Sequence, residues 1–137
     1  MAEKWILPSL AYVALLGVFG ITLKYALRSV TWQELVIYTA GAYAIVALIL
    51  LATGIDASFH GGLNGAMAAI SAFIPPLAIV ALFIALNHGL ASRVVPLTTA
   101  YPFITVILAA IFLSESFTWR SIFGSLLIVG GAIALTV

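Results

Sequence analysis

Long apolar stretches divide the chain, and short polar joints separate them. The apolar stretches cover about residues 5–27, 34–54, 65–90, 94–113 and 117–137. A helix needs about 20 mostly apolar residues to cross the hydrocarbon core of a bilayer. A membrane barrel would alternate apolar and polar residues over about ten positions, and none of these stretches does so. The pattern predicts an all-α membrane protein, one domain built as a bundle of about five transmembrane helices.

The joints carry signals that are typical of helix ends. Thr31 and Glu34 have the spacing of a capping box at the start of the second span. Trp5, Trp32 and Trp119 fall at span starts, and tryptophan is enriched at the headgroup level of membranes. The joint at residues 88–93 is barely polar, so four spans with one long hairpin form the alternative.

The amino-acid composition indicates whether the chain is surrounded by water or by lipid. Hydrophobic residues make up 65% of the 137 residues, charged residues make up 7%, and the mean hydropathy is +1.30. Soluble domains carry about 25% charged residues, so the lipid bilayer is the expected surrounding of this chain. The first apolar stretch is long enough to span, and we expect it to be retained as a helix and not cleaved as a signal peptide.

The low net charge and the absence of cysteine argue against several kinds of partner and cofactor. The net charge of +1 and the lack of a basic run argue against a nucleic-acid partner. Cysteine is absent, and the sequence shows no constellation of metal ligands. We therefore expect no disulfide, no metal and no cofactor.

An odd number of spans places the two chain ends on opposite sides of the membrane. We call the side of the N-terminus side A and the other side B. Lys4 and Arg120 fall on side A, whereas Lys24, Arg28 and Arg93 fall on side B. This small majority favours side B in the cytoplasm, because lysine and arginine concentrate in cytoplasmic loops. Either the chain inserts both ways and forms an antiparallel pair, or one orientation dominates and any dimer is parallel.

Lys24 is a candidate substrate-binding residue. It lies about one turn from the side B end of the first span and shares a helix face with Gly17 and Gly20. An intramembrane lysine is a functional candidate by default, although a lysine near the surface can also extend its stem to the headgroups. Small residues mark helix contacts, so the shared face favours a Lys24 that faces the bundle.

Other polar residues fall near Lys24 at side B, namely Glu34, Asn87, His88 and Arg93. Asn87 is a second candidate for substrate binding, and Glu34 has a charge that could pair with Lys24. Glu34 and His88 are the candidates for carrying a coupling proton, because histidine titrates near neutral pH. The alternative is that these residues only solvate helix ends.

The fourth span carries the most polar stripe within any span. Thr98, Tyr101, Pro102 and Thr105 share one face at spacings of three, four and seven residues. The stripe predicts substrate binding by hydroxyl groups, and Pro102 frees a backbone carbonyl. The alternative is threonine bonded to its own helix and tyrosine packed in the bundle. The Pro75-Pro76 pair predicts a break or a simple kink in the third span.

Two glycines mark the last span. Gly124 and Gly131 lie one heptad apart, with Ile128 on the same face. Small residues at that spacing let two helices approach closely. The pair predicts either a dimer contact or close packing within one subunit.

From Ala85 onward, the sequence resembles the EamA repeat of the drug/metabolite transporter superfamily. That repeat shows a small-residue turn followed by Ala-Ser and Pro-Leu, a span with an inner proline, a Leu-x-Glu hairpin and a final span with glycines. The matching positions are Gly89, Ala91, Ser92, Pro96, Leu97, Pro102, Leu113, Glu115, Gly124, Gly130 and Gly131. The segment from Gly17 to Lys24 is also similar to the family's glycine-then-lysine stretch.

The chain departs from this family in one large respect. Most EamA proteins carry two such repeats, whereas this chain carries one, and a lone repeat supplies half the wall of a transport cavity. The resemblance therefore implies a homodimer. The related small multidrug resistance proteins have a carboxylate inside the first span, but no Asp or Glu lies between Trp5 and Leu27 here. Proton-coupled export of cationic drugs is accordingly not implied.

These features predict an integral membrane transporter of a small organic solute or metabolite, acting by alternating access in a bacterial or archaeal inner membrane. Its central cavity is expected among the first, third and fourth spans. A lipid-linked sugar flippase subunit is the first alternative, and it would use Lys24, Arg28 or Arg93 on an anionic phosphate. A non-transporting accessory membrane subunit is the second. The spans hold no paired carboxylates and no nucleophile with a base, so we expect no enzyme.

Overall fold

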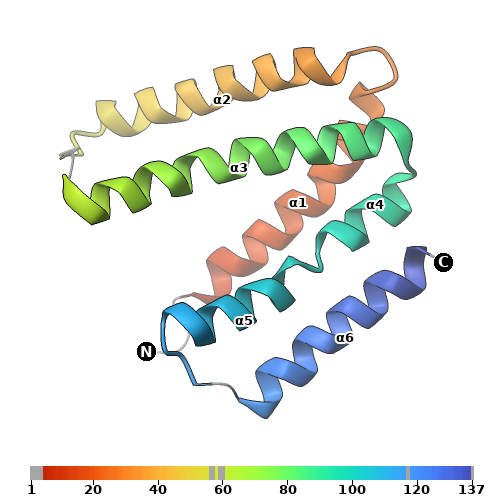
Figure 1. Cartoon of the computed structure of the whole chain (residues 1–137). Coiled ribbons are helices and arrows are strands. Elements are labelled where there is room, and N and C mark those ends of the chain that lie inside the picture. The colour runs from red at the N-terminus through yellow and green to blue at the C-terminus, as the bar shows by residue number, and fades with distance from the viewer. Residues whose placement is uncertain (1–4, 56–57, 59–60, 117, 137) are drawn as a thin grey trace. The chain divides into compact units, whose positions relative to one another are not determined.

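The described part of the chain consists of helices and their connections. The computed structural model describes residues 5–55, 58, 61–116 and 118–136. The expected span ends at residues 117 and 137, and the side A residue Lys4, lie outside these residues. The helices are α1 (Ile6–Ala26), α2 (Trp32–Ala52), α3 (Gly62–His88), α4 (Ala91–Thr98), α5 (Tyr101–Phe112) and α6 (Trp119–Thr136) (Figure 1). No strand occurs in the described residues, which confirms the all-α prediction.

Within the described residues, five spans are long and apolar enough to cross a membrane. Four are single helices, and α4 and α5 together form the fourth span over Ala91–Phe112. The barely polar joint at residues 88–93 is a true connection, because α3 ends at His88 and α4 begins at Ala91. The prediction of five spans is therefore confirmed over the alternative of four. The ends of the helices differ by a few residues from those expected.

The exposed surface of the helices is apolar. Large side chains along every span lie open, among them Leu7, Phe73 and Phe112 with 72–76% of their surface exposed. Water would make such a surface aggregate, whereas lipid tails solvate it without cost. The chain is thus a multi-pass integral membrane protein.

Local chemistry explains where the helices end. Thr31 caps α2 in a full capping box, in which its hydroxyl accepts from the Glu34 backbone N–H and the Glu34 carboxylate accepts from the Thr31 backbone N–H. Gly54 follows the end of α2 with φ of +77°, a left-handed conformation that glycine adopts without strain. Ser114 takes φ of +54° in the turn after α5, which reverses the chain toward α6.

The proline pair does not break the third span. Pro75 and Pro76 both lie inside α3, which runs continuously from Gly62 to His88. The prediction of a break there is wrong, because the helix continues through both prolines. A proline removes only its own backbone donor, and the hydrogen bonds of the neighbouring turns can carry the helix past it.

The chain divides into two compact units. One comprises Met1–Lys24 and His88–Val137, and so contains α1, α4, α5 and α6, while the other comprises Tyr25–Asn87 and contains α2 and α3. In the second unit, α2 and α3 run in opposite directions (Figure 1). In the first, α6 contacts both α4 and α5. The residues of the candidate site lie mostly in this first unit.

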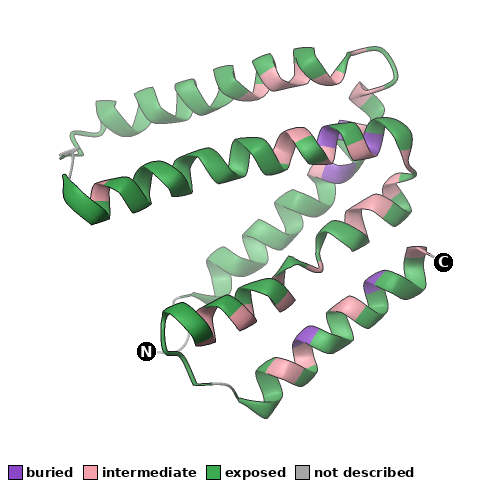
Figure 2. Cartoon of the chain, viewed as in Figure 1, coloured by how far each residue is buried: buried purple, intermediate pink, exposed green. Residues whose placement is uncertain are grey.

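The inner face of α6 is set by small side chains. Ser125 and Ala132 are its buried residues, seven positions apart, and Ile122 and Val129 on the same face are half-buried. Figure 2 shows the two buried positions in purple along the helix. Because α4 and α5 are the helices that contact α6, this face packs on the broken fourth span.

Candidate functional site

Lys24 is tied to the backbone at the start of the fourth span. Its ammonium donates a 2.8 Å hydrogen bond to the carbonyl oxygen of Gly89, and the side chain is half-buried. A cation that bonds a carbonyl just beyond the end of a helix also interacts favourably with the helix dipole. Lys24 therefore joins the end of α1 to the turn that precedes α4.

Close packing supports this junction one turn earlier on α1. Gly20 is buried, and a Cβ at this position would lie 3.0 Å from a methyl carbon of Val95 on α4. Leu23 is buried beside it, whereas residues 6–18 of α1 are exposed. Gly17 has open space where a Cβ would be. The packing of α1 is thus concentrated at its side B end.

We expect the replacement of Lys24 by methionine to destabilise this junction. The change keeps the stem and removes the donor to Gly89, and a hydrogen bond to a charged group contributes about 1.5–3 kcal/mol. Thermal unfolding in detergent should show a lower midpoint for Lys24→Met and a smaller change for Lys24→Arg, which keeps the charge. A Lys24→Met variant with unchanged stability but lost transport would instead indicate that Lys24 binds the solute.

Glu34 is engaged at a helix terminus. One carboxylate oxygen accepts 2.8 Å hydrogen bonds from both the backbone N–H and the hydroxyl of Thr31. The carboxylate is thus part of the cap of α2. Its proposed role in proton coupling stays a prediction, now with a structural role beside it.

The other side B candidates lie at the surface of the chain. Asn87 and His88 form the exposed end of α3, and Arg93 is exposed in the first turn of α4. Their order along the chain places them near the turn that Lys24 bonds. Their roles in binding and coupling stay predictions.

The polar stripe lies at a break in the fourth span. Helix α4 ends at Thr98 and α5 begins at Tyr101, so two residues in the middle of a transmembrane segment are not helical. Pro102 lies in the first turn of α5, where its missing N–H costs no hydrogen bond. The sequence predicted that Pro102 frees a backbone carbonyl within the fourth span. In the structure, the break in the span lies just before Pro102.

Threonine hydroxyls satisfy the backbone around this break. Thr98 donates to the carbonyl of Val95 at 2.8 Å, Thr99 donates to that of Pro96 at 2.6 Å, and Thr105 donates to that of Tyr101 at 3.3 Å. Each hydroxyl oxygen keeps lone pairs that can accept further hydrogen bonds. All three threonines are exposed, so this face offers acceptors and no free hydroxyl donor from them.

Tyr101 adds a contact to α1. Its hydroxyl interacts with the hydroxyl of Tyr12, and both side chains are 54% exposed. The stripe therefore lies next to a polar group on the first span, which the sequence did not predict. A helical pattern gives the face of each residue on its own helix, but it does not give the partner across a helix pair.

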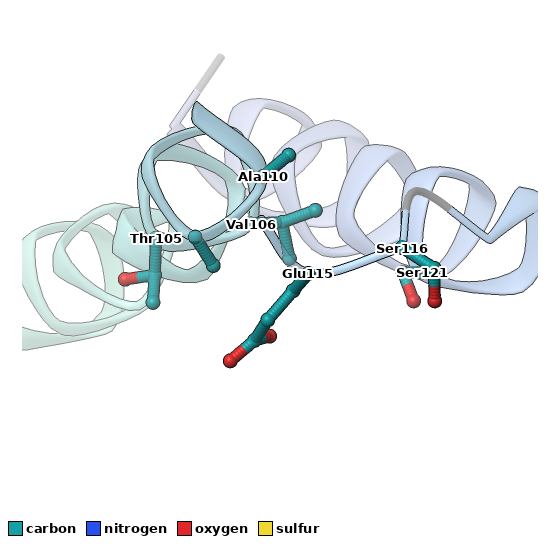
Figure 3. A pocket seen from close by; sticks show the side chains of 7 residues that line it. Thr105, Val106, Ala110, Glu115, Ser116 and Ser121 are labelled. Carbon is teal, nitrogen blue, oxygen red and sulfur yellow. The ribbon is translucent and has the colours of Figure 1, made fainter. Parts of the chain in front are cut away.

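A cavity of about 140 Å³ lies between α5 and α6 near side A. Figure 3 shows the labelled lining side chains, with Thr105 on α5 and with Ser116 and Ser121 close together further along the chain. The lining residues are Thr105, Val106, Ala109, Ala110, Glu115, Ser116 and Ser121. We call this cavity the α5–α6 groove.

The groove contains residues that sequence reasoning missed. Thr105 was a substrate-binding candidate, but Glu115, Ser116 and Ser121 were not. In the sequence, Glu115 and Ser116 belong to the hairpin that joins the last two spans, and Glu115 is the glutamate of its Leu-x-Glu pattern. The available signal was the position of a carboxylate and two serines in a hairpin that follows a polar stripe.

Gly124 and Gly131 make no close contact within the described part of the chain. Both have open space where a Cβ would be, and Gly131 is exposed. The inner face of α6 is formed instead by Ser125 and Ala132, one position further along the helix. A Cβ added at either glycine would meet no atom within 4 Å among the described residues, and the choice between a dimer contact and packing within one subunit stays a prediction.

Comparison with known proteins identifies the family of the chain. The sequence profile of the EamA-like transporter family matches residues 3–137. The chain belongs to this family, and the resemblance of its C-terminal half is confirmed. Membership indicates a membrane transporter, and it gives no indication of catalysis.

One curated relative is the uncharacterized protein MJ1333.1 of Methanocaldococcus jannaschii. It is 41% identical over 70 residues, which are 51% of this chain and 51% of the relative. The alignment thus spans about half the length of the relative. No solved structure matches the chain.

Proposed function

We propose that the protein transports a small organic solute or metabolite by alternating access, as a homodimer in the inner membrane of a bacterium or archaeon. Family membership supports membrane transport. The break between α4 and α5 is the main observation that supports a solute-binding site in the fourth span. Thr98, Tyr101, Pro102 and Thr105 are its solute-binding residues, together with Asn87 and Lys24 toward side B.

The break implies a non-lipid environment on one side of the fourth span. Non-helical backbone at membrane depth is tolerated where it is buried in protein or lines a water-filled cavity. Thr98, Thr99 and Tyr101 around the break are exposed in this chain. Interrupted helices mark the binding sites of many transporters, which supports a solute pathway along this segment.

The hydrogen-bonding character of the stripe favours a solute with N–H or O–H donors. The hydroxyl donors of Thr98, Thr99 and Thr105 are used on backbone carbonyls, so their oxygens act as acceptors. An amino-acid-like solute presents an ammonium group to such acceptors. A lipid-linked phosphate would instead need hydrogen-bond donors, which these three hydroxyls do not offer. This favours the metabolite transporter over the flippase subunit.

A second copy of the chain completes the proposal. One five-span repeat supplies half of a cavity, and the open row of Gly124 and Gly131 on α6 is available for close helix contact. An accessory subunit without transport would need neither the break nor the stripe. The dimer is a proposal here, as are its contact residues.

A ligand screen tests the proposed function. We expect amino acids or amines to raise the unfolding temperature of the purified protein, because a ligand that binds only the folded state stabilises it. Inorganic phosphate should have no such effect. Thr98→Val should lower the affinity for the active solute by about two- to tenfold, since it removes one hydrogen-bond partner.

The matched control is Thr39→Val on α2, where the hydroxyl also bonds its own helix, at 2.8 Å to the Leu35 carbonyl. This variant should bind the solute as the unchanged protein does. Uptake of the same solute into proteoliposomes then separates transport from binding. If no solute is bound and none is moved, the accessory-subunit interpretation replaces the transporter.

A further inference from the structure

We propose that α1 is a gate helix that pivots at its side B end against a block formed by α4, α5 and α6. Gly20, Leu23 and Lys24 of α1, together with Gly89 and Val95, are called the side B junction, and this junction is the pivot. The side A end of α1 is the part that moves. The role as a gate rests on the proposed transport function, whereas the pivot itself does not.

Helices α4, α5 and α6 form the fixed support. Helix α6 contacts both halves of the broken fourth span, and its buried residues Ser125 and Ala132 lie on one face. Because one helix packs on both halves, α6 keeps α4 and α5 together across the break. The three helices therefore provide one surface against which α1 can change its tilt.

The packing of α1 is confined to its side B end. Gly20 and Leu23 are buried and Lys24 is half-buried, whereas residues 6–18 are exposed. A Cβ at Gly20 would lie 3.0 Å from a methyl carbon of Val95, so the backbone of α1 approaches α4 closely at this point. A segment with few buried contacts moves at the lowest cost in free energy. That segment of α1 is its side A part.

A hydrogen bond holds the same end of the helix. The ammonium group of Lys24 donates to the Gly89 carbonyl oxygen at 2.8 Å, in the turn that precedes α4. The lysine stem is flexible and its ammonium group has three rotatable donors, so this bond can persist while the helix tilts. The bond therefore fixes the position of the side B end without fixing the angle of α1.

The part of α1 beyond the junction moves as one rod. The helix is continuous from Ile6 to Ala26, so a tilt at the junction is carried to the side A end. The length from Ile6 to Gly20 is about 21 Å, and a tilt of about 15° would displace the side A end by about 5 Å. A displacement of this size changes access to the fourth span from side A.

One hydroxyl contact connects the exposed part of α1 to the fourth span. The hydroxyl of Tyr12 interacts with that of Tyr101, and both side chains are 54% exposed. Water or a solute can satisfy both hydroxyls when this contact opens. Tyr101 belongs to the proposed solute site, so a solute that bonds its hydroxyl competes with Tyr12. The contact thus links occupation of the site to the tilt of α1.

Distances between spin labels test the pivot without transport. The chain lacks cysteine, so pairs of introduced cysteines carry the only labels. The side A pair is Leu10→Cys with Ile111→Cys, the side B pair is Ile21→Cys with Leu135→Cys, and all four native side chains are exposed. Labelled protein is diluted with unlabelled protein in nanodiscs, so that each measured distance lies within one chain. We expect pulsed electron paramagnetic resonance to show a spread at side A that exceeds the spread at side B by about 5 Å.

Variants locate the pivot and the closing contact. Tyr12→Phe should shift the side A distances toward larger values and leave the side B distances unchanged. The matched control is Tyr43→Phe, which removes an exposed hydroxyl from α2 and should change neither. Lys24→Met should widen the side B distribution more than Lys24→Arg, which keeps the charge and donors. Leu7→Cys replaces Leu10→Cys if that variant does not fold.

The outcomes separate the pivot from the proposed function. A side A spread no larger than the side B spread overturns the pivot, whether both are narrow or both are wide. Narrow distances at both ends would mean that a second copy of the chain holds α1 in place. Solute uptake that persists in that case leaves the proposed transport function standing. A pivot that is confirmed in a protein that moves no solute would leave the motion and remove its role as a gate.

Discussion

Replacing Gly20 with leucine should strongly destabilise the protein, whereas the same replacement at Gly17 should have little effect. A Cβ at Gly20 would lie 3.0 Å from the Val95 side chain, and the further atoms of leucine have no space on that side. Overpacking of this kind typically costs about 1–3 kcal/mol. At Gly17 nothing lies within 4 Å of the added Cβ, and leucine is a better helix former than glycine. Chemical denaturation in detergent measures both.

Val95→Ala provides the compensating change for this prediction. It removes the methyl carbons that lie nearest to Gly20, so Gly20→Ala should be less harmful in a Val95→Ala background than alone. A double-mutant cycle gives the coupling between the two positions, which should be about 0.5–3 kcal/mol for side chains in contact. Additive effects would mean that α1 and α4 do not pack at this point. A larger loss at Gly17 than at Gly20 would place a second copy of the chain against Gly17.

The number and nature of the spans were predictable because they follow from composition and length. Each span is an apolar run of about the length that a bilayer requires, and the same apolar residues remain exposed in the folded chain. The cap at Thr31 and Glu34 was predictable for a similar reason, since both partners lie within one turn of the chain. Local and compositional signals therefore determine most of this fold.

Interruptions within spans were harder to predict. The Pro75-Pro76 pair was the stronger proline signal, yet α3 runs through it, while the fourth span breaks ahead of the single Pro102. Thr98 and Thr99 bond carbonyls near the break with their side chains, which gives the backbone an alternative to the helical hydrogen bonds. A proline in the sequence shows only that one backbone N–H is missing. Whether the helix ends there depends on the hydrogen bonds that the neighbouring residues make.

Contacts between helices were the least predictable part. The sequence showed that Lys24 lies at a helix end, but its partner is the backbone carbonyl of Gly89, and any residue could supply that atom. On α6, the glycine row and the Ser125–Ala132 row both repeat every seven residues, and only the second faces inward. Periodicity identifies a row of small residues, and the neighbouring helices select which row is buried.

Orientation should be the easiest property of this protein to change, and we expect that change to remove most of its activity. The five basic residues divide three to two between the two sides of the membrane. Two lysines added on either side would therefore give that side the larger number of basic residues. Two lysines between α2 and α3 should fix side A in the cytoplasm, and two near Val30 should fix side B there. The chain lacks cysteine, so one cysteine added at the C-terminus reports its side through an impermeant maleimide.

The activity of these fixed variants distinguishes the two kinds of dimer. Two fused repeats with an odd number of spans are inverted relative to each other, and a lone repeat reaches that symmetry only when copies insert in both directions. Under the antiparallel proposal, each fixed variant alone should lose most solute uptake, and co-expression of the two should restore it. Full uptake by one fixed variant alone would exclude the antiparallel pair. The active unit would then be a parallel dimer or a monomer, and the near-balance of charge would follow from having only five basic residues to distribute.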